Sequence, residues 1–150
     1  LKDCLLHADI CILGRKVNCI EVSACPAGRH VYDELIPMAT GVDIAEQYIR
    51  HMSGGSHNFH PVFNKRMYLG YFNMEKCFIH GIPSAQEISD RLPEGLKLRK
   101  WQCNIKLLDY MGTITDEASL LDRGCFIIEG KEETALEKAA DMVIDSFELK

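Results

Sequence analysis

The sequence has no apolar run near the length of a membrane span and no excess of positive charge. A transmembrane helix needs about 20 consecutive apolar residues. Charges at Lys2, Asp3 and Asp9 also leave no legible signal peptide. Lysine and arginine number 17 against 22 aspartates and glutamates, a balance that repels phosphate backbones and disfavours nucleic acid as a partner. We therefore expect a cytoplasmic globular protein that binds neither membranes nor nucleic acid.

The seven cysteines lack the spacing of a metal site, because no two stand as C-x-x-C. An odd number in a chain large enough to build its own core also argues against a disulfide scaffold. Hydrophobic residues make up 47% of the 150 residues and no repeat or long linker divides them, so one lobe over residues 1–150 is predicted. The chain begins with Leu1 rather than Met, and we expect it to be a piece of a longer protein.

Apolar, β-branched stretches at residues 8–13 and 16–24 flank a turn and predict a hairpin. Further strands are predicted over 66–82, 95–111 and 124–129, and helices over 31–52 with a break around Pro37 to Gly41, over 84–92 and over 132–147. The helices are segregated rather than alternating regularly with strands. This order predicts an α+β fold with a mostly antiparallel sheet and flanking helices.

Two acids are predicted to face each other on the hairpin. With a three-residue loop, Gly14 to Lys16, Asp9 lies opposite Glu21 and Cys11 lies opposite Cys19. A two-residue loop would instead place the two acids on opposite faces. The reverse face of the hairpin is predicted to join the core through Ala8, Ile10, Ile12, Ile20 and Val22.

Opposed carboxylates repel each other unless something neutralises them. A divalent cation would do so, and oxygen ligands from Asp9 and Glu21, with the Ser23 hydroxyl on the same face, suit Mg²⁺. The alternative is that both acids are solvated and that nearby lysine or arginine relieves the repulsion. Both interpretations remain open at this point.

The run Glu21-Val22-Ser23-Ala24-Cys25-Pro26-Ala27-Gly28, with Asp9 twelve positions before Glu21, resembles the E-x-N-x-R segment of the ATP-grasp ligases. In that family the upstream acid, the Glu and the Asn hold magnesium ions that bridge the ATP phosphates, and the Arg contacts the reacting group. Gly41-Val42-Asp43 resembles the family's helix start after this loop, and residues 124–140 resemble the last strand and helix of its carboxylate-amine ligases.

The resemblance implies roles for individual residues. Asp9, Glu21 and Ser23 would bind Mg²⁺ and, through it, ATP, with Ser23 standing where Asn is usual. The substrate-binding candidates are Cys25, Gly28, Arg29 and His30, of which Arg29 is also the catalytic candidate. Cys25 stands where Arg is usual, and a thiol cannot supply the charged, two-pronged donor of a guanidinium.

The implied reaction is a Mg²⁺-dependent ligation, in which ATP phosphorylates a small carboxylate to an acyl phosphate and an amine displaces the phosphate. Such an enzyme also needs a preceding lobe with phosphate-covering lysines, so this chain would be the C-terminal part, inactive alone and prone to self-association through exposed apolar surface. One alternative, based on Cys25, is a noncatalytic ATP-grasp-like binding or assembly module. Another is an independent α+β interaction domain whose hairpin acids are merely exposed.

Overall fold

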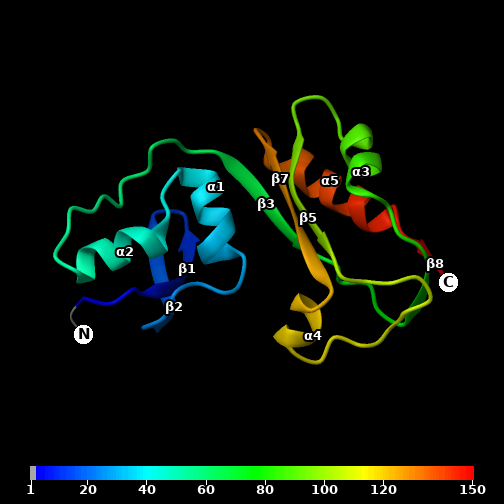
Figure 1. The fold of residues 1–150 in the computed structure, drawn as a ribbon, viewed down its shortest axis with the longest axis horizontal. Helices are drawn as coiled ribbons and strands as arrows, with labels where there is room; N and C mark the ends of the chain where they lie inside the picture. Colours follow the sequence, from blue (N-terminus) through cyan, green and yellow to red (C-terminus); the bar gives the residue numbers. More distant parts are fainter. Residues whose placement is uncertain (1–2) are drawn as a thin grey trace. The chain divides into compact units, whose positions relative to one another are not determined.

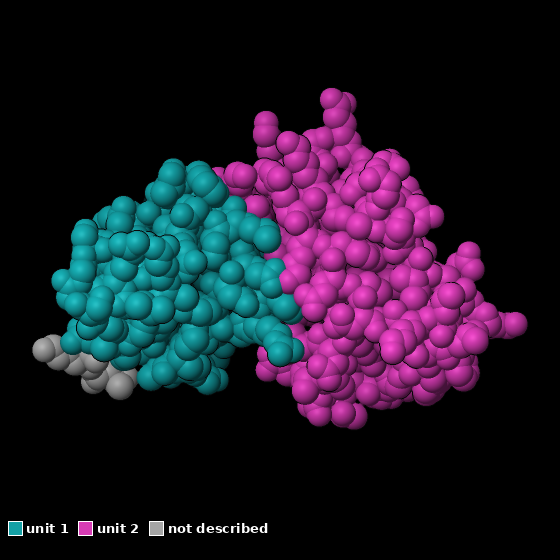
Figure 2. All heavy atoms as spheres, in the orientation of Figure 1, with its two compact units in different colours: residues 1–63 teal, residues 64–150 magenta. Residues whose placement is uncertain are grey.

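The computed structural model describes residues 3–150, which form two compact units, unit 1 up to Phe63 and unit 2 from Asn64 to Lys150 (Figures 1 and 2). Both units combine helices with antiparallel strands, so the predicted α+β class with antiparallel pairing is confirmed. A lobe can hold two such units, and the single lobe over residues 1–150 stays a prediction. Among the helices in the described part of the chain, none has the length and apolarity to cross a bilayer.

Unit 1 pairs a hairpin with a helical segment. Its elements are β1 (His7–Leu13), β2 (Lys16–Ser23), the π-helical turn η1 (Val31–Leu35), α1 (Ile36–Thr40) and α2 (Ile44–Met52). The helical break is at Gly41, with φ of 76°, rather than at Pro37. Pro37 lies in the first turn of α1, a position that proline commonly takes. Asp43 begins α2 as predicted, accepting a hydrogen bond from the Glu46 backbone N–H at 2.9 Å.

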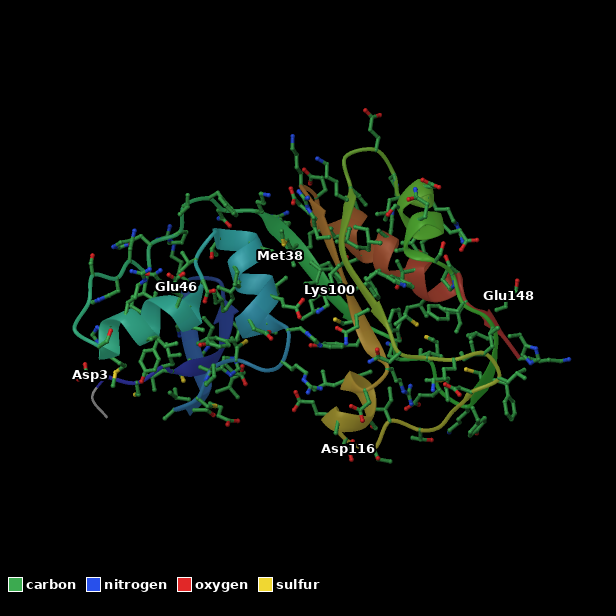
Figure 3. The ribbon with its side chains drawn as sticks, in the orientation of Figure 1. Asp3, Met38, Glu46, Lys100, Asp116 and Glu148 are labelled. Atoms are coloured by element: carbon green, nitrogen blue, oxygen red, sulfur yellow. The ribbon has the colours of Figure 1, made fainter. Side chains whose placement is uncertain are left out.

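Unit 2 contains two three-stranded antiparallel sheets, ordered β3-β7-β5 and β6-β4-β8. Its elements are β3 (Arg66–Tyr71), β4 (Cys77–Gly81), α3 (Ala85–Arg91), β5 (Lys97–Cys103), β6 (Tyr110–Met111), α4 (Glu117–Leu121), β7 (Gly124–Gly130), α5 (Glu133–Asp145) and β8 (Glu148–Leu149). The predicted strands over 66–82 and 95–111 are each broken into two shorter ones. Helix α4 was not predicted; Asp116, labelled in Figure 3, caps it by accepting a hydrogen bond from the Ser119 N–H at 2.8 Å.

Strand β7 is the centre of the larger sheet, and helix α5 packs on that sheet (Figure 1). Residues 124–128 of β7 are all buried, and because successive side chains point to opposite faces, both faces of this strand are covered. Helix α5 buries Leu136, Ala139, Ala140 and Val143, the spacing of one helical face. The core of unit 2 is thus built from segments that the sequence pattern identifies most clearly.

Candidate functional site

A loop of two residues, Gly14 and Arg15, joins β1 to β2, because Leu13 pairs directly with Lys16. Gly14 has a φ of 61°, and a glycine with positive φ is favoured at the first position of such loops. The predicted three-residue loop is therefore wrong.

The shorter loop changes which residues face each other near the turn. Cys11 lies opposite Asn18, and Cys19 lies opposite Ile10, so the predicted Cys11–Cys19 pair is wrong. Because neighbouring residues of a strand point to opposite faces, the two thiols lie on opposite faces of the hairpin. All seven cysteines are within the described residues, and no disulfide joins any two of them.

A β-bulge next to Asp9 restores the predicted pairing of the two acids. The register shifts by one residue between Asp9 and Ile10, so that Ile20 of β2 is an extra residue and Asp9 pairs with Glu21. The bulge compensates for the shorter loop. As a result, Asp9 and Glu21 are cross-strand partners although the loop length on which the prediction was based is wrong.

Four polar side chains share this face of the hairpin: His7, Asp9, Glu21 and Ser23, with His7 paired to Ser23. The Ser23 hydroxyl donates a hydrogen bond to Glu21 Oε1 at 3.0 Å. The His7 Nε2 lies 3.5 Å from Asp9 Oδ1, and the side chains of these two residues are 42% and 58% exposed. The resulting face is open to solvent. The sequence analysis did not assign His7 to this face, although its position two residues before Asp9 on the same strand places it there.

The donors on this face fit a hard divalent cation. The two carboxylates and the hydroxyl are oxygen ligands, which Mg²⁺ prefers, whereas His7 offers a nitrogen; the open surface leaves room for the waters and phosphate oxygens that would complete the shell of the ion. Asp9, Glu21 and Ser23 are the residues that would hold it.

The reverse face of the hairpin is apolar but does not join a core. Ile10 is 53% exposed, Ile12 63% and Val22 55%, so the prediction of a buried face is wrong for these residues. Ile20, the extra residue of the bulge, is 71% exposed. Ala8, the smallest of the predicted set, is exposed as well. A two-stranded sheet buries a face only when another layer covers it.

The predicted substrate residues follow β2 in the loop over residues 24–30. Cys25, Gly28 and Arg29 are exposed. The Gly28 carbonyl accepts a hydrogen bond from the Val31 N–H at 3.1 Å and so begins the helical segment. His30 differs from the others because it is 7% exposed and has a left-handed backbone with φ of 68°.

His30 is held by the turn that it caps. Its Nδ1 lies 2.8 Å from Glu34 Oε1, and the ligand atoms of His30, Asp33 and Glu34 all lie within 4.8 Å of one another. Sequence analysis missed Asp33 and Glu34, although positions three and four after a histidine share its face in a helix. The hydrogen bond with Glu34 holds the imidazole against the helical segment.

Comparisons of the chain with protein-family models, curated proteins and solved structures gave no match.

Proposed function

We propose that the chain is the C-terminal part of an ATP-grasp-like carboxylate-amine ligase that uses Mg²⁺ and ATP. The observation that carries the proposal is the cross-strand pairing of Asp9 with Glu21, which the β-bulge restores. Opposed carboxylates on an exposed hairpin cost stability without a counterion. The extra residue in β2 keeps Asp9 and Glu21 opposite each other despite this cost, and a cation bound between the two carboxylates would offset it.

In this proposal Asp9, Glu21 and Ser23 bind the ion, and the Ser23 hydroxyl also orients Glu21. The hydrogen bond from the Ser23 hydroxyl to Glu21 Oε1, at 3.0 Å, leaves the second carboxylate oxygen of Glu21 for the ion. Bound Mg²⁺ would neutralise charge on the phosphate oxygens of ATP during phosphoryl transfer. The two carboxylates would act electrostatically and would move no proton.

The loop over residues 24–30 would bind the carboxylate substrate. Arg29 is exposed on this loop and is the cation that we propose contacts the substrate or its acyl phosphate. Cys25, Gly28 and His30 would contribute to the same binding surface, with His30 positioned by Glu34. We further propose a cytoplasmic location, since ATP is available there and none of the seven cysteines of the described chain is oxidised to a disulfide.

A noncatalytic ATP-grasp-like binding or assembly module is the second candidate, and Cys25 favours it. The thiol is exposed where the family uses an arginine, and it cannot make the paired charge-assisted hydrogen bonds of a guanidinium. Cys25→Arg separates the candidates when it is made in a protein that carries the preceding lobe. A noncatalytic module that lost its activity with the arginine would gain ligase activity. An active ligase whose site is rearranged around Cys25 would not.

The apolar face of the hairpin is the surface that we propose another lobe or a second copy of the chain covers. Ile10, Ile12 and Val22 on this face are each more than half exposed, and contiguous apolar patches on soluble proteins commonly mark interaction surfaces. Light scattering on the chain alone should detect self-association that Ile12→Lys reduces. Monomers at every concentration would contradict this part of the proposal.

Metal binding by the hairpin can be tested on the chain itself with Mn²⁺, a paramagnetic substitute for Mg²⁺. Removing one of the two carboxylate ligands should weaken binding of the ion strongly. We therefore expect Glu21→Gln to reduce the Mn²⁺ affinity at least about tenfold, as measured by water relaxation. Mg²⁺ should compete with Mn²⁺ in the wild-type chain.

The matched control is Glu133→Gln, which removes one exposed carboxylate from unit 2. It should leave the Mn²⁺ affinity within about twofold of wild type, because Glu133 is not on the hairpin and is not one of the proposed ligands. Equal affinities of wild type and Glu21→Gln would rule out a site between Asp9 and Glu21. In a protein with the preceding lobe, Glu21→Ala should abolish Mg²⁺-dependent nucleotide binding.

A further inference from the structure

Unit 2 has a cavity of about 630 Å³ at one end of its β3-β7-β5 sheet. Its lining combines the start of β3, the start of β5 and the end of β7 with the residue that follows it. Four cationic side chains contribute to this lining, namely Lys65, Arg66, Lys97 and Lys131. We call it the basic cavity. It is concave and large enough for a small organic molecule.

The basic cavity is positive although the whole chain carries a net charge of −5. Glu129 is the only carboxylate in its lining. This carboxylate is already paired, since its Oε2 accepts hydrogen bonds from Arg99 Nε at 2.7 Å and from Lys65 Nζ at 3.4 Å. An excess of cations in a hollow concentrates positive potential there and attracts anions.

The pairing of the strands brings these charges together. Arg66 lies opposite Gly130 on the β3 side of β7, and Lys97 lies opposite Glu129 on the β5 side. The Arg66 guanidinium donates a hydrogen bond to the Lys131 carbonyl at 3.1 Å, which links two strands at the rim. Arg66 and Lys97 therefore belong to the sheet, and Lys65 and Lys131 each lie directly beside the end of a strand.

Two of the cations have no acidic partner. Among residues 3–150, no carboxylate oxygen forms an ion pair with the ammonium group of Lys97 or Lys131, and both side chains are exposed. Gly130, which precedes Lys131, is buried, and a Cβ there would overlap the Leu96 side chain and lie 3.0 Å from the Leu136 side chain. The close backbone packing holds Lys131 at the edge of the cavity while its charge remains available to a ligand.

We propose that the basic cavity binds a small phosphate-bearing anion with two or more negative charges. Lysine ammonium groups bind phosphate as point charges. Several cations around one hollow match a multiply charged ligand better than a single carboxylate. The proposed function assigns no role to this cavity, and the inference does not depend on it.

The test uses the full chain and titrates inorganic pyrophosphate by calorimetry at low ionic strength. Wild-type chain should bind it, and the double substitution Lys97→Ala/Lys131→Ala should lower the affinity at least about tenfold. The control Lys106→Ala/Lys138→Ala removes the same charge from exposed positions outside the cavity lining and should change the affinity less than about twofold. Raising the ionic strength from about 0.01 M to about 0.15 M should weaken binding.

Further titrations identify the source of the phosphate. Inorganic phosphate and glycerol phosphate separate a site for the free ion from a site for a phosphate ester, and binding of either one supports the proposal. The charge reversal Lys131→Glu provides a second variant if the double substitution unfolds. Equal losses in the cavity variant and its control would overturn the proposal. So would binding of single-stranded RNA or acidic vesicles by the cavity without binding of any small phosphate.

Discussion

At the scale of a single residue, the charge of the Glu129 carboxylate contributes to the stability of unit 2. Burial of its carboxyl raises the pKa, but hydrogen bonds and positive charges from Arg99 and Lys65 outweigh this and lower the pKa below its ordinary value of 4.5. A lowered folded-state pKa means that the ionised carboxylate stabilises the fold. This stabilisation is complete above the unfolded-state pKa and is lost as the pH falls through the folded value.

We therefore expect Glu129→Gln to destabilise unit 2 at pH 7 but much less at acid pH. The side chain is 21% exposed, and the expected loss at pH 7 is about 1 kcal/mol or less, as for other partly screened pairs. Urea denaturation of both proteins at about pH 7 and about pH 3 measures the difference. A loss of the same size at both pH values would show that the hydrogen-bonding geometry, rather than the charge, stabilises the fold.

At the scale of a strand, Gly124 allows the backbone of β7 to approach the backbone of β5 closely. It begins β7 opposite Cys103 with a φ of 100°, a conformation that residues with a Cβ rarely adopt. A Cβ at this position would also overlap the carbonyl oxygen of Gln102. The antiparallel pairing of β7 with β5 depends on the absence of a side chain here.

Gly124→Ala should destabilise the protein by about 2–4 kcal/mol, since it combines backbone strain with an overlap against backbone. Gly112→Ala is the matched control, because a Cβ at Gly112 would meet no atom within 4 Å and its φ is not positive. The control should change stability by less than about 0.5 kcal/mol. Chemical denaturation followed by circular dichroism measures both, and equal effects would contradict the assignment of a backbone constraint at Gly124.

Elements with a strong local pattern could be predicted from the sequence. Residues 124–130 and 133–145 form β7 and α5 close to the predicted bounds, because apolar runs and helical periodicity are local signals. The strand order β3-β7-β5 could not be predicted, since pairing is decided by contacts between residues far apart in the chain. The same holds for Arg123, whose buried guanidinium donates to the carbonyls of Met74 and Gly112.

Part of the candidate site could be predicted from the sequence, because that part depends on residues close together in the chain. Asp9 and Glu21 are close in sequence and joined by one turn, so their pairing could be proposed, but the bulge at Ile20 has no signal in the apolar alternation. The basic cavity could not be predicted, because it combines Lys65 with Lys97 and Lys131 across three strands. Local chemistry can be predicted from sequence, whereas a site gathered from distant segments requires the fold.

At the scale of the whole chain, the core is distributed unequally between the two units. Every residue of the main buried cluster belongs to unit 2, from Phe72 to Phe147. In the described part of unit 1, Val42 is the only buried apolar side chain, and it is 5% exposed. Burial of apolar area is the main source of folding free energy. Unit 2 therefore has the means to fold by itself, and unit 1 does not.

We predict that a fragment of residues 64–150 unfolds cooperatively and that a fragment of residues 1–63 shows no cooperative transition. Trp101 reports on unit 2 alone, because it is the single tryptophan and packs edge-on against Phe72 at 5.2 Å between ring centroids. Tryptophan fluorescence of the 64–150 fragment in urea should give one sigmoidal transition, and circular dichroism should follow the same curve. The 1–63 fragment has no tryptophan and is followed by circular dichroism and limited proteolysis. A protease-sensitive 64–150 fragment with a gradual, non-cooperative transition would show that the core of unit 2 is insufficient.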